Sequence, residues 1–134
     1  MKNRKVIPII RNNQREEALL DIDRETPCIT LTLEDNDPET YSGADIFDCL
    51  GDIIKKHSDI KFLCKGAKRT VRPSSMSSQM SSGIAAYEHT LGKHVSLTDV
   101  VNIFDYEDQD IINDPQLQKD HFFLWTESIR QAKD

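Results

Sequence analysis

At 134 residues, with 37% hydrophobic and 30% charged side chains, the chain has the length and composition of one globular domain able to bury a core. It is too apolar for a disordered tail and too polar for a membrane protein, and no apolar run approaches the roughly 18 residues of a membrane span. A net charge of -6 argues against a general nucleic-acid binder, because phosphate contacts need a basic surface.

The cysteines and the start of the chain predict a cytoplasmic location. Three cysteines, an odd number at wide spacing, each lie in an apolar context: Cys28, Cys49 and Cys64. This pattern is typical of reduced thiols that act as small core residues. The first basic residues are followed by only five weakly apolar residues interrupted by Pro8, so no secretory signal is predicted. We expect a single cytoplasmic domain over residues 1–134.

The first half of the chain carries the strand patterns. Residues 5–10 are apolar enough for a strand, but Pro8 cannot donate to a ladder, so we expect an edge strand or an extended arm. Residues 17–23 fit either a short strand or a helical turn. Residues 27–33 alternate between aliphatic side chains and threonines, which predicts a half-buried strand.

A turn-rich acidic loop, residues 34–39, precedes the helix with the clearest pattern. Ser42 and Asp45 have the spacing of a capping box. Side chains of one helical face then recur at intervals of three and four residues: Ile46, Phe47, Leu50, Ile53, Ile54 and His57. Residues 60–64 alternate again and predict a strand, with residues 68–72 as its hairpin partner.

The second half of the chain carries helical patterns. Serine caps precede a stripe at helical spacing, formed by Met76, Met80, Ile84, Tyr87 and Leu91. A second capping box, Ser96 with Asp99, predicts a short helix over residues 97–104. Asp114 and Pro115 fit the start of a last helix. Its predicted buried side comprises Leu117, His121, Leu124, Trp125 and Ser128.

Together these elements predict an α+β fold. We expect a small antiparallel or mixed sheet packed against one helix in the first half, followed by a helical second half. The sequence contains no internal repeat and no low-complexity linker that would divide it.

Patterns typical of catalysis or metal binding are weak. The cysteines lack the local signature of a catalytic thiol, and His89 and His94 are five residues apart across Gly92, which is not a zinc-ligand spacing. We therefore predict no metal and no cofactor. The alternative is a small cytosolic enzyme, a hydrolase or transferase, that uses Cys49 with a histidine or the clustered acids around residue 107.

Basic side chains suggest two further hypotheses. Lys68, Arg69 and Arg72 precede the serine-rich run, which fits an anion site, although helix capping also explains the serines. The same three residues, together with Arg4 and Lys5, would suit a nucleic-acid accessory module if they gathered on one face.

Charge is segregated along the chain, and the stretch 102–114 is the most informative part of it. Residues 25–52 include eight acidic residues and no Lys or Arg. Residues 99–114 include six acidic residues, again with no Lys or Arg. In the stretch 102–114 these acids alternate with Phe104, Tyr106 and two isoleucines. Such a mixture suits a docking surface for a basic partner, and it equally suits an acidic loop whose aromatics turn into the core.

A resemblance to a known family rests on five short segments: Cys64–Arg69, Arg72–Met76, Leu91–Lys93, Val101–Asp105, and Gln118–Lys119 with Trp125. These segments resemble immunity proteins of contact-dependent growth inhibition and related bacterial toxin systems. The resemblance covers roughly residues 60–128 and includes no diagnostic motif. It implies a cytosolic protein that binds the toxin domain delivered by a neighbouring cell, often a nuclease with a basic cleft, and blocks its active site or its access to substrate.

We therefore predict a non-enzymatic immunity protein that neutralises a cognate toxin domain through an acidic protein–protein interface, with no membrane and no direct nucleic-acid contact. Complementary charge would speed association, and a desolvated aromatic would slow dissociation. The predicted contacts are Asp105, Tyr106, Glu107, Asp108 and Asp110, with the loop residues Glu34, Asp35 and Asp37 as the second choice.

Overall fold

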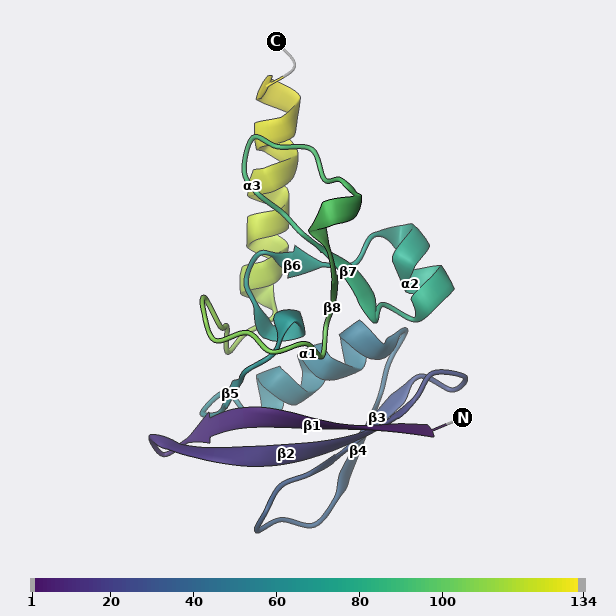
Figure 1. Ribbon diagram of the computed structural model, residues 1–134, viewed down its shortest axis with the longest axis vertical. Helices are drawn as coiled ribbons and strands as arrows, with labels where there is room; N and C mark the ends of the chain where they lie inside the picture. The colour runs from purple at the N-terminus through teal and green to yellow at the C-terminus, as the bar shows by residue number, and fades with distance from the viewer. Residues whose placement is uncertain (1, 133–134) are drawn as a thin grey trace.

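The computed structural model describes residues 2–132 and has an α+β architecture (Figure 1). A five-stranded antiparallel sheet, curved as a half-barrel, has the order β4-β3-β2-β1-β5. Its strands are β1 (Lys2–Arg11), β2 (Gln14–Asp23), β3 (Cys28–Thr32), β4 (Glu39–Ser42) and β5 (Lys61–Phe62). The strand predicted over residues 27–33 is thereby confirmed, and residues 17–23 form a strand rather than a helical turn.

The β1–β2 hairpin is the longest paired unit of the sheet. Asn12 and Asn13 join the two strands with positive φ angles of 54° and 61°, the backbone that a two-residue turn between twisted strands requires and that asparagine tolerates. The carbonyl of Pro8 points towards the β5 side, where the residue after β5 bonds to it: Leu63 N donates to Pro8 O at 2.9 Å. The N–H that proline lacks would point to the same side, so the pairing of β1 with β2 does not need it. Ile9 and Ile10 pair with β5, so the edge strand predicted over residues 5–10 is confirmed only for the part before these two residues.

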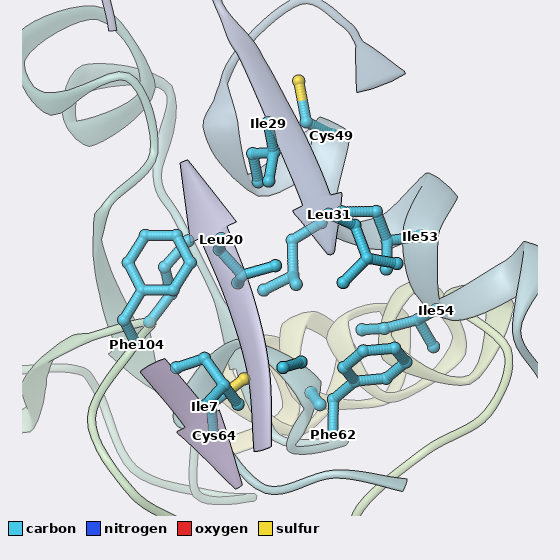
Figure 2. Packing of buried hydrophobic residues seen from close by; sticks show 14 of the residues in the cluster. Ile7, Leu20, Ile29, Leu31, Cys49, Ile53, Ile54, Phe62, Cys64 and Phe104 are labelled. Carbon is cyan, nitrogen blue, oxygen red and sulfur yellow. The ribbon is translucent and has the colours of Figure 1, made fainter. Parts of the chain in front are cut away.

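Helix α1 (Ile46–Lys56) covers one face of this sheet. The five fully buried residues of α1 are those at helical spacing: Ile46, Cys49, Leu50, Ile53 and Ile54. They pack against the inward residues of β1 to β3 and against Phe62 (Figure 2). The cap differs from the prediction, because Asp45 rather than Ser42 is the N-cap and accepts from Asp48 N at 2.7 Å.

The predicted helical second half is wrong, because it also contains a three-stranded antiparallel sheet of order β6-β7-β8. Its elements are η1 (Lys65–Ala67), β6 (Val71–Arg72), α2 (Ser75–Ser81), β7 (Ala85–Glu88), η2 (Leu97–Asp99), β8 (Val100–Asn102) and α3 (Gln116–Ala132). Residues 71–72 pair with β7, so the predicted hairpin with residues 60–64 does not form. The capping box of Ser96 and Asp99 is present, but the helix it begins is one 3-10 turn.

The long helix predicted from Met76 to Leu91 ends at Ser81 for local reasons. Ser81 donates its hydroxyl hydrogen to Ser77 O at 2.7 Å, and its Oγ accepts from Ala85 N at 3.0 Å, so the side chain replaces the continuing helical bonds. Ser82 and Gly83 then adopt positive φ angles, and a Cβ on Gly83 would lie 2.8 Å from Asp45 Oδ2. Met76 and Met80, predicted as part of a packed stripe, are exposed.

Helix α3 begins as predicted, with Asp114 Oδ1 accepting from Gln116 N at 3.0 Å, but its buried side differs. His121 is buried as expected, whereas Leu117 and Leu124 are 41% and 58% exposed. The most buried residue is Gln118, whose Nε2 donates to Gly66 O and Lys68 O, both at 2.9 Å, and reaches Val71 O at 3.3 Å. Among residues 2–132, no helix has the length and apolar character of a membrane span.

Two buried histidines, His89 packed against α3 and His121 within it, are expected to make stability depend on pH. Burial lowers the pKa of His89, which packs against Trp125 and Phe122, and burial also lowers the pKa of His121. A group whose pKa is depressed in the folded state takes up protons more readily when unfolded. We expect the free energy of unfolding to fall as the pH decreases below about 6.5, and the His89→Gln/His121→Gln variant to show a shallower fall. Urea denaturation followed by Trp125 fluorescence at several pH values measures this. The expectation is wrong if the free energy of unfolding falls equally with pH in the wild type and the variant.

Candidate protein-docking surface

The two predicted acidic segments, far apart in sequence, lie on either side of the end of the β1–β2 hairpin (Figure 1). The guanidinium of Arg15 lies 5.5 Å from the centre of the Tyr106 ring, and Arg11 Nη2 lies 3.6 Å from Asp35 Oδ2. The hairpin therefore joins the loop at residues 105–110 to the loop at residues 34–38. We call this surface the acidic end, and it consists of Glu34, Asp35, Asp37, Asp105, Tyr106 and Asp108.

The loop at residues 105–110 is held by backbone hydrogen bonds to the segment that follows β5. Lys65 N donates to Asp105 O at 2.8 Å, Arg69 N donates to Asp110 O at 3.0 Å, and Ile112 N donates to Ala67 O at 2.9 Å. An isolated antiparallel bridge between Cys64 and Tyr106 adds to this ladder. The loop is thus fixed at both ends, which lowers the entropy lost when a partner binds it.

Glu107 points inward, into a cluster of four charged side chains. Lys65 Nζ and Lys68 Nζ each lie 2.9 Å from Glu107 Oε1, and Lys68 Nζ also lies 2.8 Å from Glu88 Oε2. The other oxygen, Glu107 Oε2, accepts from the backbone N–H groups of residues 108 and 109. Burial opposes ionisation of Glu107, but the bonds from Lys65 and Lys68 outweigh it and lower the pKa to about 2. Both oxygens of the Glu107 carboxylate are bonded within the protein, so we do not propose Glu107 as a contact for a partner.

Asp110 is also engaged within the molecule, whereas its neighbours face solvent. Arg69 Nε lies 3.2 Å from Asp110 Oδ1, and Asp110 has a φ of 59°, so both its side chain and its backbone are committed to the turn. Tyr106 is 49% exposed and donates to Asp108 Oδ2 at 3.3 Å. Within the part of the chain that the structure describes, Asp105 and Asp108 form no ion pair.

The loop between β3 and β4 presents its acids outward, as expected for the second-choice contacts. Glu34, Asp35 and Asp37 are all exposed, and the Asp35 side chain is 81% exposed despite its contact with Arg11. Counted over residues 2–132, Glu34 and Asp37 have no ion pair. Both acidic segments therefore leave carboxylates available to a partner.

An apolar depression that the sequence analysis missed adjoins the acidic end. It occupies about 760 Å³ on the sheet face opposite α1, with Val6, Pro8 and Leu19 as its apolar part and Arg15, Glu17 and Glu34 among its charged lining residues. Val6 and Leu19 are cross-strand partners, and Val6 is 50% exposed. The sequence does indicate this apolar surface, because residues 6–10 are apolar at every position and a strand with this pattern is apolar on both of its faces.

Cys49 and Cys64 give little support to the enzyme alternative, which needs a reactive thiolate. Burial raises the pKa of both Cys49 and Cys64 to about 12, so neither forms a thiolate near neutral pH. Cys49 donates to Pro27 O at 3.5 Å, in the core. Neither the depression above nor the groove of about 550 Å³ between α1 and the start of α3 is lined by a cysteine or a histidine.

Four of the five basic residues in the nucleic-acid hypothesis are engaged within the molecule. Arg4 is paired with Asp21 on the sheet, Lys68 and Arg69 are paired as described, and the Arg72 guanidinium lies 5.6 Å from the Phe122 ring centre.

In comparisons with known proteins, no family model matches this sequence and a search of curated proteins gives no match.

Proposed function

We propose that this protein is a non-enzymatic immunity protein that binds a bacterial toxin domain and blocks it through the acidic end. The observation that carries the proposal is the arrangement of two acidic segments around one hairpin, with five carboxylates turned outward beside a half-exposed tyrosine. The resemblance over residues 60–128 suggested this role, and the toxins of such systems are often nucleases. A nuclease presents a basic cleft, which is the complement of this surface.

The charges and the apolar residues would have separate tasks in such a complex. Outward carboxylates attract a basic partner over a range set by the Debye length, which is about 10 Å at 0.1 M salt, and so raise the association rate. Tyr106 and the depression formed by Val6 and Leu19 offer apolar area that can be desolvated, which slows dissociation. The rigid attachment of the loop keeps both parts in place before binding.

Neutralising the exposed acids is expected to weaken capture of the partner. In Asp105→Asn/Asp108→Asn the side-chain shapes are retained while the net charge rises by two. Tagged wild type should retain a basic protein from a lysate of the native host, and the double variant should retain at least about tenfold less of it. The matched control is Asp52→Lys, which makes the same net-charge change at an exposed site on α1 and should capture as the wild type does.

The captured protein must also behave as a toxin. Its expression alone should stop bacterial growth, co-expression with the wild type should restore growth, and co-expression with Asp105→Asn/Asp108→Asn should restore it poorly. The proposal fails if the captured protein is harmless, or if both variants rescue growth as well as the wild type does. The adjacent reading frame gives an independent check, since a large secreted protein with a variable C-terminal domain is expected there.

A further inference from the structure

Helix α3 exposes three large apolar side chains, and one of them lies on its outer face. Phe123 is 69% exposed, Leu124 is 58% exposed and Leu117 is 41% exposed. Figure 1 shows α3 standing upright from the rest of the molecule, with the small sheet along one side of it. Gln118 and His121 lie on that packed side, and Leu117 and Leu124, four and three residues from His121, lie on the flank next to it. Phe123 is the one of the three that points away from the packed side, and it is the most exposed of them.

The charged residues around Phe123 have a self-complementary order. Lys119, Phe123 and Glu127 follow one another at intervals of four residues, so they form one row along the helix. All three are exposed, and in the described part of the chain Lys119 has no ion pair. If a second α3 lies antiparallel with its Phe123 opposite the first, each Lys119 faces the Glu127 of the other copy.

We infer that the protein forms a symmetric dimer through α3, with the two helices antiparallel and the two Phe123 rings at the two-fold axis. An interface around a two-fold axis requires that each surface be the complement of itself, and a row of cation, aromatic and anion meets that requirement when it is reversed. A uniformly basic partner would meet Lys119 and Arg130, and a uniformly acidic one would meet Asp120 and Glu127. A second copy of this chain avoids both conflicts.

The size of the contact predicts a weak dimer. A helix of 17 residues is about 25 Å long, and its outer side offers a narrow contact compared with the roughly 800 Å² per partner of a stable interface. Glu127 lies 3.4 Å from Arg130 of its own helix, in an exposed pair that leaves it free to interact with a second cation. We expect dissociation in the micromolar range or above, with Phe123 as the main anchor.

Sedimentation equilibrium of the wild type, from about 10 μM to about 1 mM, should show a monomer–dimer equilibrium. Phe123→Asp should raise the dissociation constant at least about tenfold. Lys119→Glu and Glu127→Lys should each weaken the dimer severalfold, because each places like charges opposite one another twice. All three positions are exposed, so thermal unfolding should be nearly unchanged, which separates loss of dimer from loss of fold.

The decisive measurement is an equimolar mixture of Lys119→Glu with Glu127→Lys. In the mixed dimer the carboxylate introduced at position 119 of one protomer would face the ammonium introduced at position 127 of its partner. The unchanged Glu127 and Lys119 would face each other, so both contacts are attractive. The mixture should therefore dimerise more tightly than either variant alone. A wild type that stays monomeric overturns the inference and leaves this face to a different protein. Unchanged dimerisation of Phe123→Asp, or a mixture no tighter than its components, overturns it as well.

Discussion

Replacing Glu107 by glutamine is expected to lower the free energy of unfolding by about 3 kcal/mol. The Glu107 side chain is only 10% exposed and balances Lys65 and Lys68, which are 24% and 16% exposed. Removing its charge leaves two partly buried ammonium groups with Glu88 as their remaining anion. Urea denaturation at pH 7 measures the loss. The control is Asp108→Asn at the exposed neighbouring position, which should change stability by less than about 0.5 kcal/mol.

The same variant should change how stability depends on acid. Because the pKa of Glu107 is lowered to about 2 in the folded protein, its contribution is present above its ordinary value of 4.5 and is lost as the pH falls from there towards 2. Without the carboxylate, this part of the acid-induced loss should disappear from the Glu107→Gln profile. A variant as stable as the wild type at pH 7, or one with the same acid profile, would show that the cluster does not stabilise the fold.

Replacing Gly66 by alanine is expected to destabilise the protein by about 2 kcal/mol. A Cβ at residue 66 would lie 2.5 Å from Leu50 Cδ2 and 2.9 Å from Ile103 Cβ, both in the core. The backbone has little room to move away, because Gly66 N donates to Ile103 O at 2.8 Å and Gly66 O accepts from Gln118.

The matched control, Gly51→Ala, should have the opposite sign. Gly51 lies inside α1, and its nearest neighbour would be Pro115 Cγ at 3.5 Å, an ordinary contact. Alanine there should stabilise the helix by about 0.5 to 1 kcal/mol, because glycine loses more backbone freedom on folding. Thermal or urea unfolding of both variants tests the pair, and equal effects of the two substitutions would refute the packing argument.

The elements that the sequence predicted well are those with a local cause. Strand β3 alternates in polarity over its full length, α1 has a continuous apolar face, and the start of α3 is fixed by Asp114 and Pro115. The strands β6, β7 and β8 have two to four residues each, too few for a period to be recognised. Their pairing depends on contacts made far along the chain, and so does the termination of α2.

The candidate site shows the same division. The sequence identified the acidic segments, because charge runs are visible without a structure. It could not show that Glu107 turns inward, since that depends on Lys65 and Lys68, 42 and 39 residues away. Nor could it show that the hairpin brings Asp35 and Tyr106 to one end of the molecule. For Leu117 and Leu124, helical spacing predicted a buried side, but the helix is rotated so that Gln118 faces the core, where three carbonyl oxygens need a donor.

The attachment of Gln118 has a consequence for how the protein matures on the ribosome. The carbonyl groups of Gly66, Lys68 and Val71 find their side-chain donor only after residue 118 has emerged, about fifty residues later in synthesis. Strands β1 to β4 and α1 are translated well before that point. A nascent chain therefore has strands β1 to β4 and α1 available early, whereas the ladder that orients Asp105 and Asp108 waits for residues 105–112. A chain truncated before α3 would leave the carbonyl groups of Gly66, Lys68 and Val71 without this side-chain donor.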